Sequence, residues 1–386
     1  MSTVVRKNIF ANLGYKQSMP QAIRCLLLAA CLAALAMPAP AALHIARRPQ
    51  PAPTRLYQIT YKGWADAFLL TNGRADVVVV PAIGRIMAYQ LAGQPQTNAL
   101  WNNPALLGKP LPYSAPYPAR ATEWINYGGD KLWPAPQDDW ARSQRQPGPW
   151  PPDPQMDYGP YHVSRIPNGL RLTGPVSDNR HVRAVRDIVL APGGTQVLLR
   201  ESFQRVPLAG AGTANPVPAL PLSLWNIAQA RPDATVFVPL NPASRFPGGY
   251  VALAGQAHEA NWHAKDGLLA ITSQTKQGDK AGVDASVGWM GALYQNTLLF
   301  TEQCALDPQA AYPDQNTPLQ VWSQGGSEAY VEMEALGPLA AQSAGQTISR
   351  TLTWNLRRLP RTPRDTGDAR RLVKSLLLSV SAGKAH

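Results

Sequence analysis

Two glutamates late in the chain have the spacing needed for acid–base chemistry. Glu332 and Glu334 are separated by one residue, and Tyr330 precedes them at the same spacing. In a β-strand this period of two places all three side chains on one face. Two carboxylates are costly to bury in an apolar core, so we expect that face to line a hydrated cavity. The alternative is an outward, solvated strand edge that binds nothing.

A second group of candidates lies in residues 123–140, which combine tryptophan with charged side chains. An indole ring can stack on the apolar C–H face of a sugar, while charged groups form strong hydrogen bonds with its hydroxyls. The cluster therefore favours a carbohydrate site, although any single tryptophan is better explained as packing a long loop onto a sheet. The candidates in this segment are Trp124, Tyr127, Asp130, Lys131, Trp133 and Trp140.

Other motifs indicate no metal and no cofactor. His258 and His263 flank a glutamate, but a spacing of five would not put both imidazoles on one helical face. The glycines at 210 and 212 lack the third glycine of a dinucleotide-binding loop. Cys304 has no matched histidine nearby, so we expect a buried and inert thiol.

The elements that must position these residues are predicted to be strands. Proline makes up 38 of 386 residues, which argues against a helix bundle because an interior proline breaks a helix. Short period-two segments bounded by turn residues instead indicate an all-β sandwich or barrel. Residues 101–160 are expected to be long loops over a sheet edge. The predicted strands are 57–62, 67–71, 76–80, 85–91, 161–166, 170–173, 182–190, 195–203, 222–228, 235–238, 250–253, 268–272, 296–301, 329–334 and 346–356.

The charge is concentrated at the two ends of the chain. The formal net charge is +12, but most of it lies in residues 1–41 and 357–386, and the body between them is nearly neutral. A nucleic-acid-binding body would be basic, so we expect no nucleic-acid partner. The pattern divides the chain into a leader (1–41), a linker (42–56), a β domain (57–356) and a basic tail (357–386).

The leader has the organisation of a secretory signal peptide. A basic segment ends at Arg24, an apolar segment covers 25–37, and small residues around Ala41 offer a cleavage site. We expect cleavage after Ala41 and a periplasmic or secreted protein. No later apolar run approaches the length of about 20 residues that a stable transmembrane anchor requires. Lipid anchoring at Cys31 is the alternative.

The basic tail is predicted to form a short helix. Asp365 or Thr366 can cap it, and apolar residues spaced by three and four give it one apolar face. We expect a terminal helix that docks on the β domain or frays; contact with an anionic membrane surface is the alternative. Because the tail lies outside the predicted sandwich, removal of 360–386 is expected to leave the thermal midpoint nearly unchanged.

Three segments together resemble a known group of proteins. They are residues 61–86, with a Gly-Arg pair at 84–85; residues 123–140, with the run GGDKLWPAP at 128–136; and residues 312–338, with YPD at 312–314 and YVEMEALGP at 330–338. The resemblance, over about 57–354, is to an uncharacterised bacterial family of the galactose-mutarotase-like (aldose 1-epimerase-like) superfamily. It implies one antiparallel β-supersandwich whose concave face binds a mono- or oligosaccharide.

The resemblance also implies roles for individual residues. Mutarotases use a late-strand glutamate as base on the anomeric hydroxyl and a histidine as acid on the ring oxygen. Glu334 matches the base, with Glu332 as its rival, whereas Trp225 stands near where the histidine would be. Proton donation could then fall to Asp130 or Lys131. Trp225 and Arg85 join the candidate sugar-binding residues.

Three functions follow from these residues. The first is an exported carbohydrate-binding protein whose catalytic status is open. The second is an aldose 1-epimerase, and the third is an envelope interaction module with a vestigial groove. The sugar and the oligomeric state are not fixed by the sequence.

Overall fold

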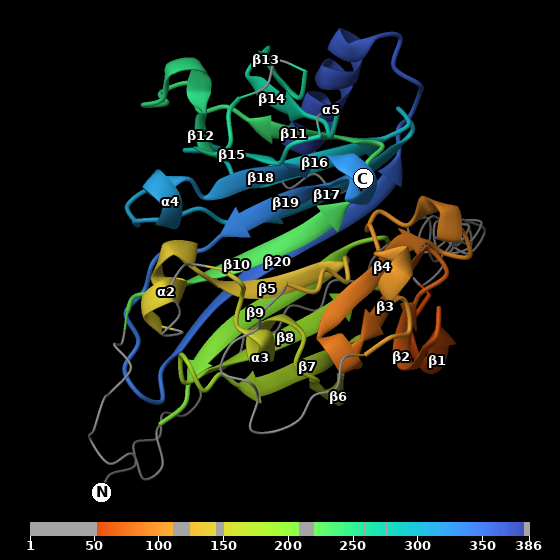
Figure 1. The fold of residues 1–386 in the computed structure, drawn as a ribbon. Coiled ribbons are helices and arrows are strands. Elements are labelled where there is room, and N and C mark those ends of the chain that lie inside the picture. The colour runs from red at the N-terminus through yellow and green to blue at the C-terminus, as the bar shows by residue number, and fades with distance from the viewer. Residues whose placement is uncertain are drawn as a thin grey trace, which may run out of the picture. The chain divides into compact units, whose positions relative to one another are not determined.

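Alternating apolar and polar side chains build two antiparallel sheets that pack face to face (Figure 1). The computed structural model describes residues 52–110, 124–143, 150–207, 220–257, 260–274 and 276–381. Within them, each sheet has ten strands. The first sheet runs β1 (Arg55–Tyr61), β2 (Trp64–Thr71), β3 (Ala75–Val80), β4 (Arg85–Leu91), β5 (Asp130–Ala135), β10 (Ser223–Ala230), β19 (Tyr330–Leu336), β18 (Leu319–Gln324), β15 (Asp279–Val283) and β12 (Val251–Ala254).

The second sheet faces the inner side of the first. Its order is β13 (Trp262–Lys265), β14 (Leu268–Ile271), β11 (Ala234–Pro239), β16 (Trp289–Tyr294), β17 (Leu298–Cys304), β20 (Thr347–Arg358), β9 (Val197–Arg205), β8 (Val182–Leu190), β7 (Gly169–Val176) and β6 (His162–Ile166). The longer helical segments are α2 (Trp140–Ser143), α3 (Pro154–Asp157), α4 (Pro313–Asn316) and α5 (Thr366–Ser381).

Alternate residues of each strand point into the core between the sheets. On β19, Val331 and Met333 join this core, and on β9 Leu199 and Phe203 do so from the opposite sheet. Burial of these apolar side chains is the main force that holds the sheets together. The predicted all-β sandwich is therefore confirmed.

The prediction that residues 101–160 form long loops is wrong in part, because this segment contains β5. This strand escaped detection because Pro134 and two charged residues interrupt its apolar pattern. β5 pairs with β10 along its length but with β4 only between Ile86 and Asp130. One edge of β5 is thus largely unpaired, and a strand edge is where proline is tolerated.

Polar groups also lie between the sheets. Arg186 forms ion pairs with Asp130 and with Glu201, the second at 3.1 Å. The Asn226 side chain donates hydrogen bonds to both carboxylates, at 2.7 and 2.9 Å. Charges removed from water are tolerated only when they are paired in this way, so this cluster fixes β5 and β10 against β8 and β9.

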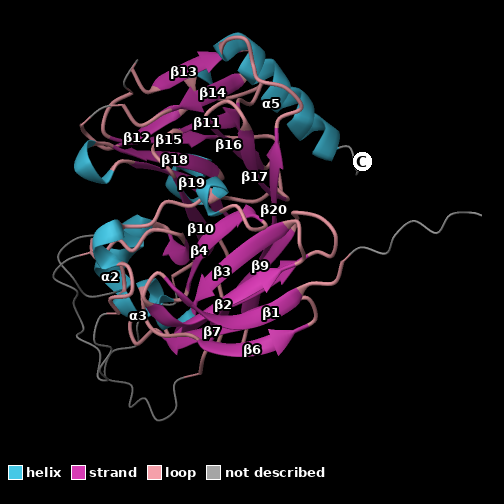
Figure 2. Ribbon diagram, turned by 90° about the vertical axis from the view of Figure 1, so that its right-hand side faces the viewer, coloured by secondary structure: helices cyan, strands magenta, loops and turns pink. Residues whose placement is uncertain are grey.

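Helix α5 covers part of the outer face of the second sheet (Figure 2). Asp365 accepts a hydrogen bond from the backbone of Asp368 at 2.7 Å, as predicted for a helix cap. Val373 and Leu377 are fully buried, against Phe237 and other apolar side chains of the sheet. The tail is therefore a docked terminal helix, as expected, and its packing predicts a loss of stability on removal of 360–386 in place of an unchanged thermal midpoint. No helix in the described ranges is both long and apolar enough to cross a membrane.

The packing of α5 predicts a loss of stability when a charge is placed in its interface. Val373→Asp should lower the unfolding free energy by about 3 kcal/mol, since it removes a buried apolar contact and introduces an unpaired carboxylate. Ser375→Asp, on the exposed side of the same helix, should change it by less than about 0.5 kcal/mol. Chemical denaturation measures both; equal effects would contradict the docked helix.

A buried glutamate of β17 predicts how stability depends on pH. Burial raises the pKa of Glu302 to about 8, although its carboxylate accepts a hydrogen bond from Trp354 at 2.7 Å. The folded state therefore holds a proton that the unfolded chain loses near its ordinary pKa of 4.5. Stability from this group is full at low pH and is lost as the pH rises through 8. Glu302→Gln should remove this fall, measured as unfolding free energy at pH 5, 7 and 9; an unchanged pH profile would contradict it.

Candidate functional site

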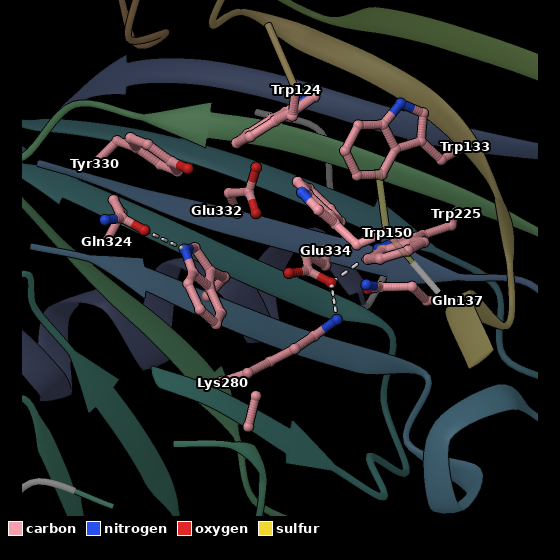
Figure 3. A pocket seen from close by; sticks show the side chains of 12 residues that line it. Trp124, Trp133, Gln137, Trp150, Trp225, Lys280, Gln324, Tyr330, Glu332 and Glu334 are labelled. Atoms are coloured by element: carbon pink, nitrogen blue, oxygen red, sulfur yellow. Dashed lines mark hydrogen bonds and ion pairs between the residues drawn. The ribbon is translucent and has the colours of Figure 1, made fainter. Parts of the chain in front are cut away.

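A pocket of about 470 Å³ lies on the outer face of the first sheet (Figure 3). Strands β5, β10, β19, β18 and β15 supply most of its floor, and residues beyond β5 close one side. Its lining consists of Trp124, Trp133, Gln137, Trp150, Trp225, Ala254, Lys280, Trp322, Gln324, Tyr330, Glu332 and Glu334.

The face of β19 that was expected to line a cavity lies on this pocket. Tyr330, Glu332 and Glu334 point outward into it, while Val331 and Met333 point into the core. Each glutamate is held by a lysine from two strands away, on opposite sides of β19: Lys131 on β5 and Lys280 on β15.

The first pair joins Lys131 and Glu332. The lysine ammonium lies 2.9 Å from Oε1 of Glu332, and the Gln229 side chain donates to the same oxygen at 2.9 Å. The ammonium also lies 4.3 Å from the ring centre of Trp133 and 4.8 Å from that of Trp124. Burial lowers the pKa of Lys131, and the charge of Glu332 opposes this shift. Lys131 thus fixes one carboxylate and two rings of the pocket wall.

The second pair joins Lys280 and Glu334. Oε2 of Glu334 lies 2.8 Å from the lysine ammonium and accepts a hydrogen bond from the Trp225 indole at 2.8 Å. The ammonium lies 4.4 Å from the centre of the Trp225 ring. Burial raises the pKa of Glu334 to about 7; Lys280 opposes this shift and the charge of Glu332 adds to it.

Strand register explains why these contacts are diagonal. Lys280 of β15 pairs with Trp322 of β18, and Trp322 in turn pairs with Glu332 of β19. The Trp322 side chain therefore lies between Lys280 and Glu332. Lys280 therefore reaches the next outward residue, Glu334. On the other side Ile227 separates Lys131 from Glu334, and Lys131 reaches Glu332 instead.

Each glutamate uses only one of its two oxygens in these contacts. Both partners of Glu332 bind Oε1, and both partners of Glu334 bind Oε2. Neither Oε2 of Glu332 nor Oε1 of Glu334 accepts a hydrogen bond from any residue in the described ranges. Because both side chains line the pocket, these two oxygens are available to a ligand (Figure 3).

The tryptophans form a connected wall of the pocket, and buried polar residues behind Trp133 support it. The Trp133 ring packs edge to face on Trp124, Trp150 and Trp225, with centroid separations of 5.9, 6.2 and 5.6 Å. Its indole donates to Asp157 of α3 at 3.0 Å, and Asp157 pairs with Arg85 of β4 at 2.5 Å. Trp150 is the most exposed ring of the wall, at 44%.

Five candidate residues do not line this pocket: Arg85, Tyr127, Asp130, Lys131 and Trp140. Arg85 is fully buried and positions Trp133 through Asp157. Asp130 points to the opposite side of β5 from Lys131, into the polar cluster between the sheets. Tyr127 packs on Trp64, with ring centres 5.7 Å apart, and Trp140 is buried behind Trp133. Asp130 therefore cannot serve as proton donor in the pocket.

Some lining residues were missed by the sequence analysis. Lys280, Trp322 and Gln324 lie on β15 and β18, two strands that were not predicted. A signal was present, because Trp322 and Gln324 alternate with the core residues Leu319 and Val321. Trp150 lacked such a signal, since it lies in irregular backbone.

The fold and the pocket define an all-β sandwich protein with an aromatic, carboxylate-bearing site on one sheet. The chain belongs to the family described as "Domain of unknown function (DUF4380)", which matches residues 66–357. This agrees with the uncharacterised family indicated by the sequence motifs. No curated protein matches the sequence.

Several solved structures are similar to this one. A galactose mutarotase-like protein from Lactobacillus casei has 10% identity and a TM-score of 0.46, covering 75% of this chain and 100% of its own. Galactose 1-epimerase from Lactobacillus acidophilus has 10% identity and a TM-score of 0.43, covering 79% and 98%. An α-galactosidase from Geobacillus stearothermophilus has 7% identity and a TM-score of 0.41, covering 79% and 41%.

The contact between Trp225 and Glu334 predicts a pH-dependent fluorescence signal. Ionisation of Glu334 changes the charge at the indole N–H, so emission should change with a midpoint near pH 7. Glu334→Gln should abolish this transition, whereas Glu328→Gln, at an exposed glutamate, should retain it. A transition that persists in Glu334→Gln would show that another group causes it.

Proposed function

We propose that the pocket binds a carbohydrate. The proposal rests on the two oxygens of each glutamate. One oxygen accepts hydrogen bonds from protein groups, and the other is open to the pocket. Sugar hydroxyls are hydrogen-bond donors that carboxylate oxygens bind strongly. The exposed face of Trp150 can stack on the C–H face of a sugar ring. The family resemblance of the sequence implied the same class of ligand.

Aromatic rings and carboxylates together would also suit a quaternary ammonium ligand. Here, however, the protein supplies its own cations to the rings. Lys131 lies against Trp124 and Trp133, and Lys280 lies against Trp225. The two lysines also balance the two carboxylates, so the pocket favours a neutral, hydroxyl-rich ligand.

Aldose 1-epimerase activity is the second candidate, and the pKa of Glu334 favours it. With a pKa near 7 and an open oxygen, Glu334 can accept the proton of an anomeric hydroxyl at neutral pH. As the ring C–O bond breaks, the ring oxygen must receive a proton; Lys280 is the ammonium nearest to Glu334. Reclosure on the other face of the aldehyde then yields the other anomer. The vestigial-groove alternative required a groove filled by side chains, whereas this pocket is open.

A glycan array and calorimetry test sugar binding. Residues 42–386 should bind a sugar on the array, and calorimetry with that sugar should show that Trp150→Ala weakens the binding free energy by about 1–3 kcal/mol. Tyr57→Ala, at an equally exposed aromatic residue of β1, should bind like wild type. Unchanged affinity of Trp150→Ala would contradict the proposed site.

Polarimetry tests the epimerase. If Glu334 is the base, wild type should accelerate mutarotation of the bound sugar, and Glu334→Gln should abolish that rate while lowering the affinity far less. A binding protein shows no acceleration in either form.

We also propose that the protein acts outside the cytoplasm after removal of residues 1–41. This segment lies outside the described residues, so the proposal rests on its signal-peptide pattern. Mass spectrometry of the exported protein should find an N-terminus at Ala42. An intact Met1 in the cytoplasm would contradict export, and a lipid on Cys31 would favour the lipoprotein.

A further inference from the structure

The dimensions of the pocket carry information about the length of its ligand. Trp133 lies on β5 and Trp322 on β18, and both side chains line the pocket. β10 and β19 stand between these strands, so the two backbones are three strand spacings apart, about 14 Å. This span exceeds a single pyranose ring, so one ring stacked against the Trp133 side leaves the Trp322 side unfilled.

The aromatic rings are also divided between these two sides. Trp124, Trp133 and Trp150 contact one another on the β5 side. Trp322 and Tyr330 stand on the β18–β19 side, where the Trp322 indole donates to Gln324 at 3.2 Å. Trp322 is only half-buried, so part of its ring can contact a ligand. Figure 3 shows Glu332 and Glu334 between Tyr330 and Gln324 on one side and Trp133 and Trp225 on the other.

The two glutamates are separated along β19, the direction in which the aromatic sides are also offset. Trp133 is level with Leu336 of this strand, whereas Trp322 is level with Glu332. Glu332 and Glu334 are two residues apart on one face of β19, which corresponds to about 7 Å along the strand. They can therefore accept hydrogen bonds from hydroxyls that are too far apart to be neighbours on one ring.

We propose that the ligand is an oligosaccharide of at least two residues, lying diagonally across the strands with one ring on each aromatic side. This inference rests on the proposed function. The carboxylates bind hydroxyls on either side of the glycosidic bond. A monosaccharide occupies only the β5 side, so its affinity is lower.

The test compares sugars of increasing length. Calorimetry is carried out with glucose, galactose and mannose, and with the disaccharides to tetrasaccharides built from each. For the series that binds, the disaccharide should bind at least about tenfold more tightly than its monosaccharide, the change expected for one added ring contact. Trp322→Ala should remove this gain, because it should weaken disaccharide binding more than monosaccharide binding, whereas Tyr57→Ala should change neither.

The outcomes separate the two proposals. If monosaccharide and disaccharide bind equally well, or if Trp322→Ala weakens both by the same factor, the ligand-length inference is wrong while carbohydrate binding stands. If no sugar of any length binds, the proposed function itself fails.

Discussion

Two carboxylates on the outer face of β19 are the constraint around which the pocket is built. Carboxylates with so little solvent contact are tolerated only when paired, and neither flanking strand offers a cation at the required position. The lysines come instead from β5 and β15, which lie symmetrically two strands away. The registers of five strands must therefore be correct together before both pairs can form.

The same lysine–glutamate pairs leave one oxygen of each carboxylate available to a ligand. A lysine that contacted both oxygens of its glutamate would leave neither oxygen free of a protein partner. Here Gln229 and Trp225 supply a second donor to the oxygen that the lysine already holds, so one oxygen of each carboxylate stays open. The aromatic wall also depends on contacts through Asp157 and Arg85. Lys131 contacts both Glu332 and the rings of Trp124 and Trp133, so the charge pairs and the aromatic wall share part of their support.

The sequence predicted the sandwich because most of its strands alternate cleanly and end at turn residues. It predicted the shared face of Glu332 and Glu334 for the same reason. It failed where a strand is short, charged or contains proline, as in β5 and β15. The side of β5 on which Asp130 and Lys131 each fall depends on a register that only pairing with β10 fixes. Arg85 and Tyr127 could not be excluded from the ligand surface, because their burial arises from contacts with distant segments.

The central claim is that lysine–glutamate pairing across strands organises the pocket. A double-mutant cycle on Lys131 and Glu332 tests it most directly, using unfolding free energies of wild type, Lys131→Met, Glu332→Gln and the double variant. If the pairing organises the pocket, each single variant should be destabilised and the double variant should lose much less than their sum, with a coupling of at least about 1 kcal/mol. Additive losses would show that the two side chains act independently, and would contradict the claim.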